Sequence, residues 1–187
     1  MSITDVVVDI ETLGTRPGDS IVQIAVVGFD RNKEYYDGEL LISVSVPLAK
    51  SEANATADTL AWWFLQNEEA KNCLLHGNQV SSRVVDGEVQ MLAVFMMAAE
   101  EEPIKSCKWW GNSHSFDLVL LEAALNRVYK TGKPWDFRKE RCYRTLKAEA
   151  PKCFVPERTT ATHVAVNDAM YEAECLYYLL RSIPKDS

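Results

Sequence analysis

The sequence has no long apolar run and no excess of basic charge. No apolar stretch approaches the roughly 20 residues that a membrane-spanning helix needs, and the acidic residue Asp5 lies where a secretory signal would be apolar. We therefore expect no association with membranes. A net charge of −7 argues against a protein that coats long nucleic acids, because such binding depends on many Lys or Arg contacts with phosphates.

Disulfide and zinc patterns are also missing. The five cysteines are odd in number and show neither a CxxC pair nor zinc-ligand spacing, which predicts reduced thiols and a cytoplasmic location. Cys73, Cys107 and Cys175 are predicted to be small core residues. At 187 residues and 47% hydrophobic composition, the chain is long enough for one well-buried core and short for two, so we expect a single domain over residues 1–187.

Hydrophobic periodicity predicts an α/β fold with a mixed central sheet of about five strands flanked by helices. The expected strands cover residues 5–11, 21–29, 35–46 and 104–110, with a short one near Arg141. Helices are expected over residues 56–66, 68–75 and 87–100, after Asp117, and over residues 168–181. Asp86 and Asn167 are the expected N-caps of the third and the last of these helices.

Two acids lie close together in the first predicted strand. Asp9 and Glu11 are two residues apart, so their side chains share one face, while Val6, Val8 and Ile10 line the other. Adjacent carboxylates repel each other unless a cation lies between them, and Mg²⁺ and Mn²⁺ prefer oxygen ligands. The alternative is a solvated pair of acids on an edge strand.

A third acid, Asp117, begins an amphipathic helix after a predicted strand. Apolar residues recur behind it at helical spacing, at Leu118, Leu121 and Leu125. An acid in a first turn also interacts favourably with the helix dipole, which would explain Asp117 without any chemistry.

His163 and Asp168 form the last candidate segment. On an ideal helix, residues five apart diverge by roughly 140°, since each residue turns the helix by about 100°. Both side chains can face one site only if His163 lies on a loop and Asp168 on the following helix. That arrangement suits a general base beside an acid, whereas a lone histidine is more commonly a plain surface or core residue.

Together these segments resemble the DEDDh family of 3′–5′ exonucleases, whose three blocks carry Asp-x-Glu, Asp and His-x-x-x-x-Asp. The resemblance runs from about Asp5 to Leu180. The stretch from Thr59 to Lys71, with Trp110-Gly-Asn and Tyr143-Arg-Thr-Leu, is similar to a mycobacterial and phage-type exoribonuclease subfamily. The chain departs from many DEDDh enzymes at Arg144-Thr145, where these have Asp-Thr.

The resemblance implies a ribonuclease H-like architecture and hydrolysis at the 3′ ends of single-stranded nucleic acid, releasing nucleoside 5′-monophosphates. It implies that Asp9 bridges two Mg²⁺ or Mn²⁺ ions and that Glu11 and Asp168 complete the first ion's site. Asp117 would act nearby, and His163 would take a proton from the attacking water. Bound cations would supply the positive charge that the composition lacks.

The resemblance also implies a substrate site. Thr12, Leu13 and Gly14 would hold the terminal nucleotide. Of the aromatic residues, Trp62, Trp63 and Phe116 are the candidates to stack on bases. Trp62 and Trp63 are neighbours on a predicted helix, so one of them should pack inward. Arg144 would contact a phosphate or a 2′-hydroxyl, or else form a surface ion pair. The segment from Lys152 to Thr162 is predicted to be a mobile loop leading to His163.

Two alternatives to an exoribonuclease stay open on the sequence. RNA is favoured over DNA by the subfamily resemblance alone, so an exodeoxyribonuclease is the first alternative. A non-catalytic nucleic-acid-binding module is the second, although such a module has no need for adjacent acids that repel each other. The oligomeric state is open as well, a homodimer included.

Overall fold

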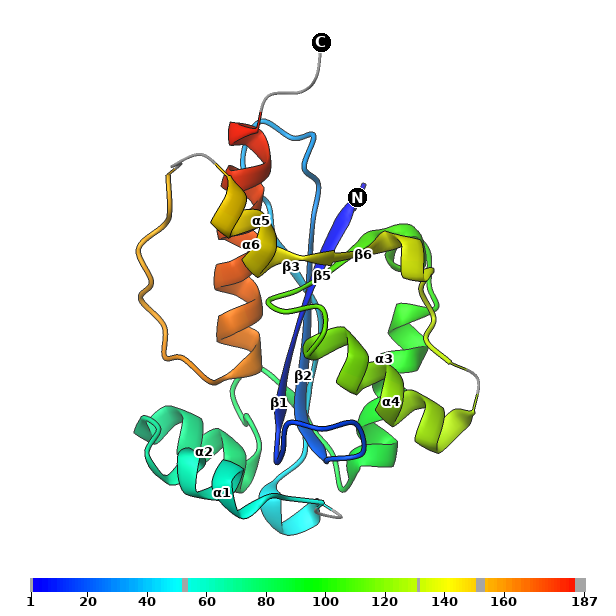
Figure 1. The fold of residues 1–187 in the computed structure, drawn as a ribbon, viewed down its shortest axis with the longest axis vertical. Helices are drawn as coiled ribbons and strands as arrows, with labels where there is room; N and C mark the ends of the chain where they lie inside the picture. The colour runs from blue at the N-terminus through cyan, green and yellow to red at the C-terminus, as the bar shows by residue number, and fades with distance from the viewer. Residues whose placement is uncertain (1, 52–53, 131, 151–153, 184–187) are drawn as a thin grey trace.

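One mixed sheet lies between two layers of helices (Figure 1). The computed structural model describes residues 2–51, 54–130, 132–150 and 154–183. Within these residues the sheet has six strands in the order β4-β3-β2-β1-β5-β6. The strands are β1 (Asp5–Thr12), β2 (Ile21–Phe29), β3 (Glu39–Ser45), β4 (Arg83–Val84), β5 (Lys108–Gly111) and β6 (Glu140–Cys142). The helices are α1 (Ala57–Phe64), α2 (Glu68–His76), α3 (Glu88–Ala99), α4 (Asp117–Tyr129), α5 (Tyr143–Glu149) and α6 (Ala165–Ser182).

The sheet topology confirms the predicted ribonuclease H-like fold. Strands β1, β2 and β3 pair antiparallel, and β5 and β6 continue the sheet parallel to β1. The predicted number of strands, about five, was low by one. The missed strand, β4, is only two residues long and pairs in parallel with β3, so no hydrophobic period in the sequence could mark it.

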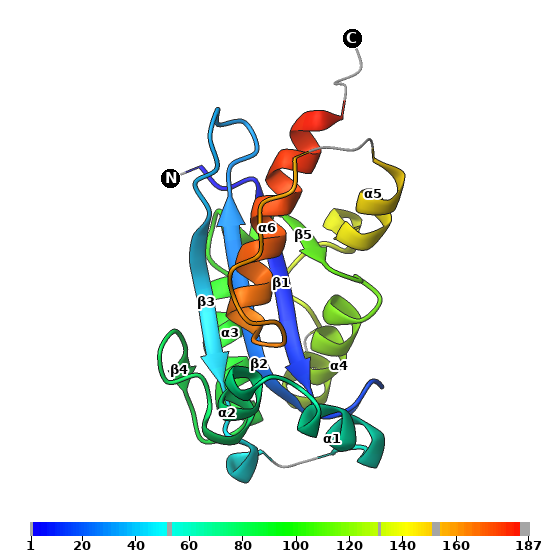
Figure 2. The same ribbon diagram turned by 90° about the vertical axis from the view of Figure 1, so that its left-hand side faces the viewer.

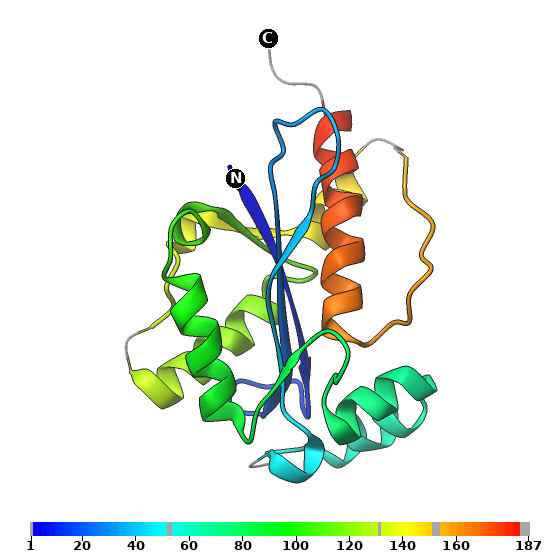
Figure 3. The same cartoon turned by 180° about the vertical axis from the view of Figure 1, so that it is seen from behind.

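The two faces of β1 enter two separate hydrophobic clusters. Val6, Val8 and Ile10 pack with residues of α3 and α4 on one face, as predicted. Val7 packs with residues of α6 and α2 on the other. Figure 2 shows α6 lying across β1 and β2, and Figure 3 shows α3 on the opposite side of the sheet. Asp9 and Glu11 share the face of Val7, so they point toward the α6 layer.

Several predicted boundaries were wrong because local patterns missed tertiary contacts. Strand β3 begins at Glu39 rather than at residue 35. The predicted strand over residues 104–110 starts as a 3₁₀ turn, Ile104–Ser106, and only its end, from Lys108, joins the sheet. Asp86 does not cap α3, because Gly87 occupies the N-cap position and the Asp86 carboxylate lies 3.4 Å from the Lys50 ammonium instead.

The N-terminus of α6 also differs from the prediction. The helix begins at Ala165, with Val164 at the N-cap position, so Asn167 lies inside the first turn. A side chain from the sheet satisfies one of the free backbone donors there, since Ala165 N–H donates to Gln23 Oε1 at 3.2 Å. The Asn167 amide donates instead to Glu69 Oε1, 3.0 Å away, and to the Ala161 carbonyl, 3.2 Å away.

Three of the four described cysteines are small core residues. Cys73, Cys107 and Cys175 are buried, as predicted, and these three and Cys142 are free thiols. Cys153, and Lys152 at the start of the predicted mobile loop, lie outside the described residues. None of the described helices has the length and apolar character needed to cross a membrane.

Candidate active site

A cleft of about 1040 Å³ opens where β1 ends, beside the N-termini of α4 and α6. Its size is at the upper end of the range for pockets that hold small-molecule ligands. The structure brings most of the predicted site residues to its walls: Asp9, Glu11, Thr12, Phe116, Asp117, Arg144, His163 and Asp168.

Asp9 and Glu11 come from the end of β1 and are both buried. The register of β1 against β2 shifts directly after Glu11, a local irregularity of the kind that is common next to active sites. Burial raises the pKa of Asp9 well above its usual value, and the negative charges of Glu11 and Asp117 add to the rise. The pKa of Glu11 is also raised, first by burial and then by Asp168.

Asp117 is placed by a close approach between a glycine and the first turn of α4. A Cβ atom on Gly111 would lie 3.0 Å from both Cβ and Oδ2 of Asp117, so only glycine fits there without displacement. The Ser113 N–H donates to Asp117 Oδ2 at 3.2 Å. Burial raises the pKa of Asp117 to about 7, and the backbone hydrogen bond from Ser113 opposes that rise.

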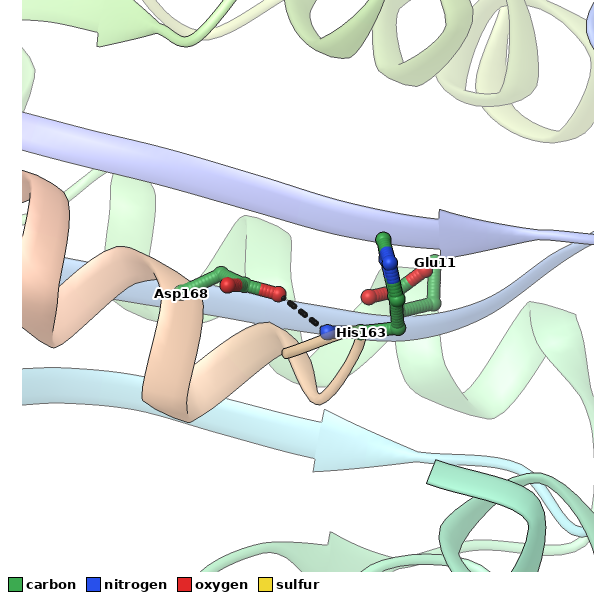
Figure 4. Close-up of side chains that lie close together, drawn as sticks. All are labelled: Glu11, His163 and Asp168. Atoms are coloured by element: carbon green, nitrogen blue, oxygen red, sulfur yellow. Dashed lines mark hydrogen bonds between the residues drawn. The ribbon is translucent and has the colours of Figure 1, made fainter. Parts of the chain in front are cut away.

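His163 lies on the loop before α6 and Asp168 in its first turn, as predicted (Figure 4). The His163 N–H donates to Asp168 Oδ2 at 2.7 Å. His163 has a φ of 63°, the left-handed region that few residues other than glycine adopt, so the surrounding contacts must hold it there. Its ring meets the Trp62 ring edge to face, with 4.7 Å between centroids. Glu11, His163 and Asp168 each have one atom able to bind a metal ion, and these three atoms lie within 4.8 Å of one another.

Comparison with known proteins agrees with this geometry. The family model described as the 3′-5′ exoribonuclease Rv2179c-like domain matches residues 4–180. The chain belongs to this family. It is also similar to an exodeoxyribonuclease of Enterobacteria phage T4, with 25% identity over 206 residues that cover 95% of this chain and 89% of the phage protein. These findings confirm the resemblance predicted from the three motifs, and the chain is a 3′–5′ exonuclease.

Two residues of the exonuclease site escaped the sequence prediction. Arg158 makes an ion pair with Asp168 Oδ1 and donates to the Ala161 carbonyl at 3.1 Å, and nothing in its loop sequence marks it. Glu172 is buried and lines the same cleft. Burial raises the pKa of Glu172 to about 8, and the charges of Asp117 and Asp168 contribute. Its spacing of four residues from Asp168 on one helix was a signal that could have found it.

Three predicted substrate contacts lie beneath the cleft rather than in its wall. Trp63 is 1% exposed, and its indole N–H donates to the Thr12 carbonyl at 2.9 Å, so Trp63 supports the floor of the cleft and Trp62 is the tryptophan that lines it. Leu13 is fully buried, and its backbone bonds to Ser20. Gly14 does not line the cleft, and its carbonyl accepts from the Thr12 hydroxyl at 2.6 Å.

Arg144 reaches the cleft from the first turn of α5. Its backbone N–H donates to the Asn112 carbonyl at 2.9 Å, and its positive charge partly opposes the rise that burial causes in the pKa of Asp117. Among the described residues its guanidinium forms no ion pair, which disfavours the predicted alternative of a surface ion pair.

The carboxylates of the exonuclease site fit hard divalent cations. Asp9 and Glu11 lie beside Asp117 and Asp168, and their raised pKa values reflect burial among like charges. A cation bound between such groups removes both the repulsion and the cost of burial, and carboxylate oxygens are the ligands that Mg²⁺ and Mn²⁺ prefer.

Proposed function

We propose that the chain is a two-metal-ion exoribonuclease that hydrolyses single-stranded RNA from the 3′ end and releases nucleoside 5′-monophosphates. The supporting observation is the cluster of Asp9, Glu11, Asp117 and Asp168 with one histidine at the floor of an open cleft. Four carboxylates this close together repel one another unless cations lie between them. The histidine on the adjacent loop is suited to proton transfer.

Asp9, Glu11, Asp117 and Asp168 are the residues that would hold two Mg²⁺ or Mn²⁺ ions, with Asp9 shared between the two. When bound, the ions would stabilise negative charge on the attacking and the leaving oxygen of the phosphodiester. Burial, and then the negative charges of Glu11, Asp117, Glu172 and Asp168, raise the pKa of Asp9, which supports a central place for Asp9 among these carboxylates.

His163 would act as the general base. Its ring meets the Trp62 ring edge to face, its backbone N–H donates to Asp168, and one ring nitrogen lies within 4.8 Å of a Glu11 carboxylate oxygen. A base must be oriented before it can take a proton from water with useful efficiency, and these contacts orient it.

Side chains around the acids would bind the terminal nucleotides. Thr12, Phe116 and Trp62 line the cleft, and aromatic rings stack on bases without regard to sequence. Trp63 would act from below by donating to the Thr12 carbonyl, and Gly14 by accepting from the Thr12 hydroxyl, while Leu13 anchors the same segment in the core. Arg144 would contact a phosphate or a 2′-hydroxyl, since its guanidinium reaches the same cleft.

RNA is the substrate that we propose because the family model describes an exoribonuclease. DNA is the second candidate, because the phage T4 relative is named an exodeoxyribonuclease. We also propose the cytoplasm as the compartment, since the four cysteines of the described residues are all free thiols.

A time course on matched oligonucleotides tests this function. RNA and DNA of one sequence, labelled at the 5′ or the 3′ end, are incubated with Mg²⁺, with Mn²⁺ or with EDTA. We expect the 3′-labelled RNA to release labelled mononucleotide at once, the 5′-labelled RNA to shorten in a ladder, and EDTA to stop both. Faster decay of DNA would favour the second candidate, and cuts inside a circular substrate would contradict an exonuclease.

A 3′-phosphate sharpens the test of polarity. The terminal nucleotide would lie against buried acids, so an extra phosphate there would meet like charge. We expect an oligonucleotide with a 3′-phosphate to resist, and the same oligonucleotide to be degraded after phosphatase treatment.

A further inference from the structure

We propose that Glu172 is a fifth carboxylate of the cation-binding centre, in addition to the four that the motifs supply. This inference rests on the proposed function, because it concerns the same cations. Neither the Asp-x-Glu block, nor the Asp block, nor the His-x-x-x-x-Asp block includes position 172.

The backbone of α6 directs Glu172 to the same site as Asp168. Residues four apart on a helix share one face and are about 6 Å apart along the axis. Both residues line the cleft that also contains Asp9 and Asp117. Glu172 therefore stands one helical turn deeper in the same acidic wall.

Glu172 is buried, and no described residue forms a hydrogen bond or an ion pair with it. It is 6% exposed, and its Oε2 atom is inaccessible to solvent and accepts no hydrogen bond from any described residue. A buried polar atom without a partner costs free energy, and nearly all such atoms in proteins are paired. An unpaired carboxylate oxygen at a cation site is explained if a cation, or water ordered by it, is its partner.

The nearest cationic side chains are engaged elsewhere. Arg158 pairs with Asp168 and lies over the Tyr171 ring, 4.9 Å from its centroid. The Lys147 ammonium lies over the Tyr143 ring, 5.5 Å from its centroid. Neither forms an ion pair with Glu172 in the described part of the chain. Among the described residues, no protein cation therefore fulfils the role that we assign to Mg²⁺ or Mn²⁺.

Calorimetric titration of the full chain with Mn²⁺ tests this assignment. We expect Glu172→Gln, which keeps the shape of the side chain, to weaken Mn²⁺ binding by about 10–100-fold, the usual effect of losing a group that supports a metal site. The matched control is Glu174→Gln, two residues along the same helix, where the carboxylate does not line the cleft. This control should bind Mn²⁺ like the wild type.

Further variants separate the outcomes. If circular dichroism shows that Glu172→Gln is unfolded, Glu172→Asp, which keeps the charge but retracts it, takes its place and should also bind more weakly. A folded variant at position 172 with wild-type Mn²⁺ affinity overturns the inference, while loss of binding in Asp9→Asn would still support the proposed function. A wild-type chain that binds no Mn²⁺ would overturn both.

Discussion

The two ends of β1 bury acids in opposite ways. Asp5, at the start of the strand, is fully buried and fully partnered: Arg31 Nε donates to its Oδ2 at 2.6 Å, and the Trp110 indole donates to its Oδ1 at 2.8 Å. Asp9 and Glu11, at the end of the strand, are nearly as buried but are surrounded by other acids. All three side chains share one face of the strand.

The difference separates a structural acid from a functional one. A buried charge with a cationic partner and hydrogen bonds is compatible with a stable fold, and losing its partner is costly. Buried acids gathered without a cation destabilise the fold and are retained where chemistry needs them. Burial alone therefore does not identify the active site. The partners around each buried acid do identify it.

Removing the acidic charge at each end of β1 should have opposite effects on thermal stability. The loss of activity at the end that carries Asp9 is the largest effect that we expect. Asp9→Asn should abolish exonuclease activity, because both proposed cations depend on Asp9, and should raise the Tm of the metal-free protein by relieving repulsion. Asp5→Asn should lower the Tm and leave activity per folded molecule unchanged. Nuclease assays and thermal melts of both variants check this. An active, folded Asp9→Asn protein would remove the basis for the two-metal proposal.

His163 lies beside Glu11 at the end of β1 but is not proposed as a metal ligand. His163→Ala should therefore lower kcat by about 10²–10⁴-fold, the usual contribution of a positioned acid or base. Mn²⁺ binding, measured by calorimetry, should survive. If His163 instead only holds the loop in place, the variant would keep its kcat and show a higher KM or a lower stability.

A substitution at the start of β1, where Arg31 pairs with Asp5, should change the stability of the fold but not its activity. Arg31→Ala leaves the Asp5 charge buried without its cation, which should lower the free energy of unfolding by roughly 3–5 kcal/mol. Asp5 lies about 13 Å along the strand from Asp9, so kcat of the folded fraction should not change. Urea denaturation and a nuclease assay below the transition check both parts. A comparable loss of kcat would mean that the two ends of β1 are coupled.

Local periodicity could predict the acids and the histidine, but not which neighbours surround them. Asp9, Glu11 and Asp117 follow from strand and helix periods, and the placement of His163 on a loop follows from its distance to Asp168 along the chain. Trp62 and Trp63 diverge by about 100° on α1, and only the docking of α1 against the end of β1 decides which ring turns inward.

Contacts that depend on tertiary structure could not be predicted from the sequence. The ion pair from Arg158 to Asp168 crosses from an irregular loop to a helix, and the Gln23 amide that meets the start of α6 comes from a strand 142 residues away. Neither has a local sequence signature. The partnered state of Asp5 was equally invisible, because Arg31 lies beyond the next strand along the chain.

The last expected effect is a gradual pH dependence of stability that belongs to the buried acids of the cleft. The pKa values of Asp117 and Glu172 in the folded protein are about 7 and about 8, above their usual values of 3.8 and 4.5. Below pH 4 these groups are protonated in both the folded and the unfolded state. Between pH 4 and pH 8 the unfolded chain releases their protons before the folded chain does, so metal-free stability should fall as pH rises.

Thermal melts of the metal-free protein between pH 5 and pH 9 should show this fall, at about 2–4 °C in Tm for each kcal/mol lost. Mg²⁺ should counter it, and the rise in Tm caused by Mg²⁺ should grow with pH, because the cation competes with protons for the same oxygens. Glu172→Gln should flatten the upper part of the metal-free curve, while Glu174→Gln should follow the wild type. A metal-free Tm that instead rises steadily to pH 9 would show that cationic partners neutralise these acids, and the contrast between the two ends of β1 would be lost.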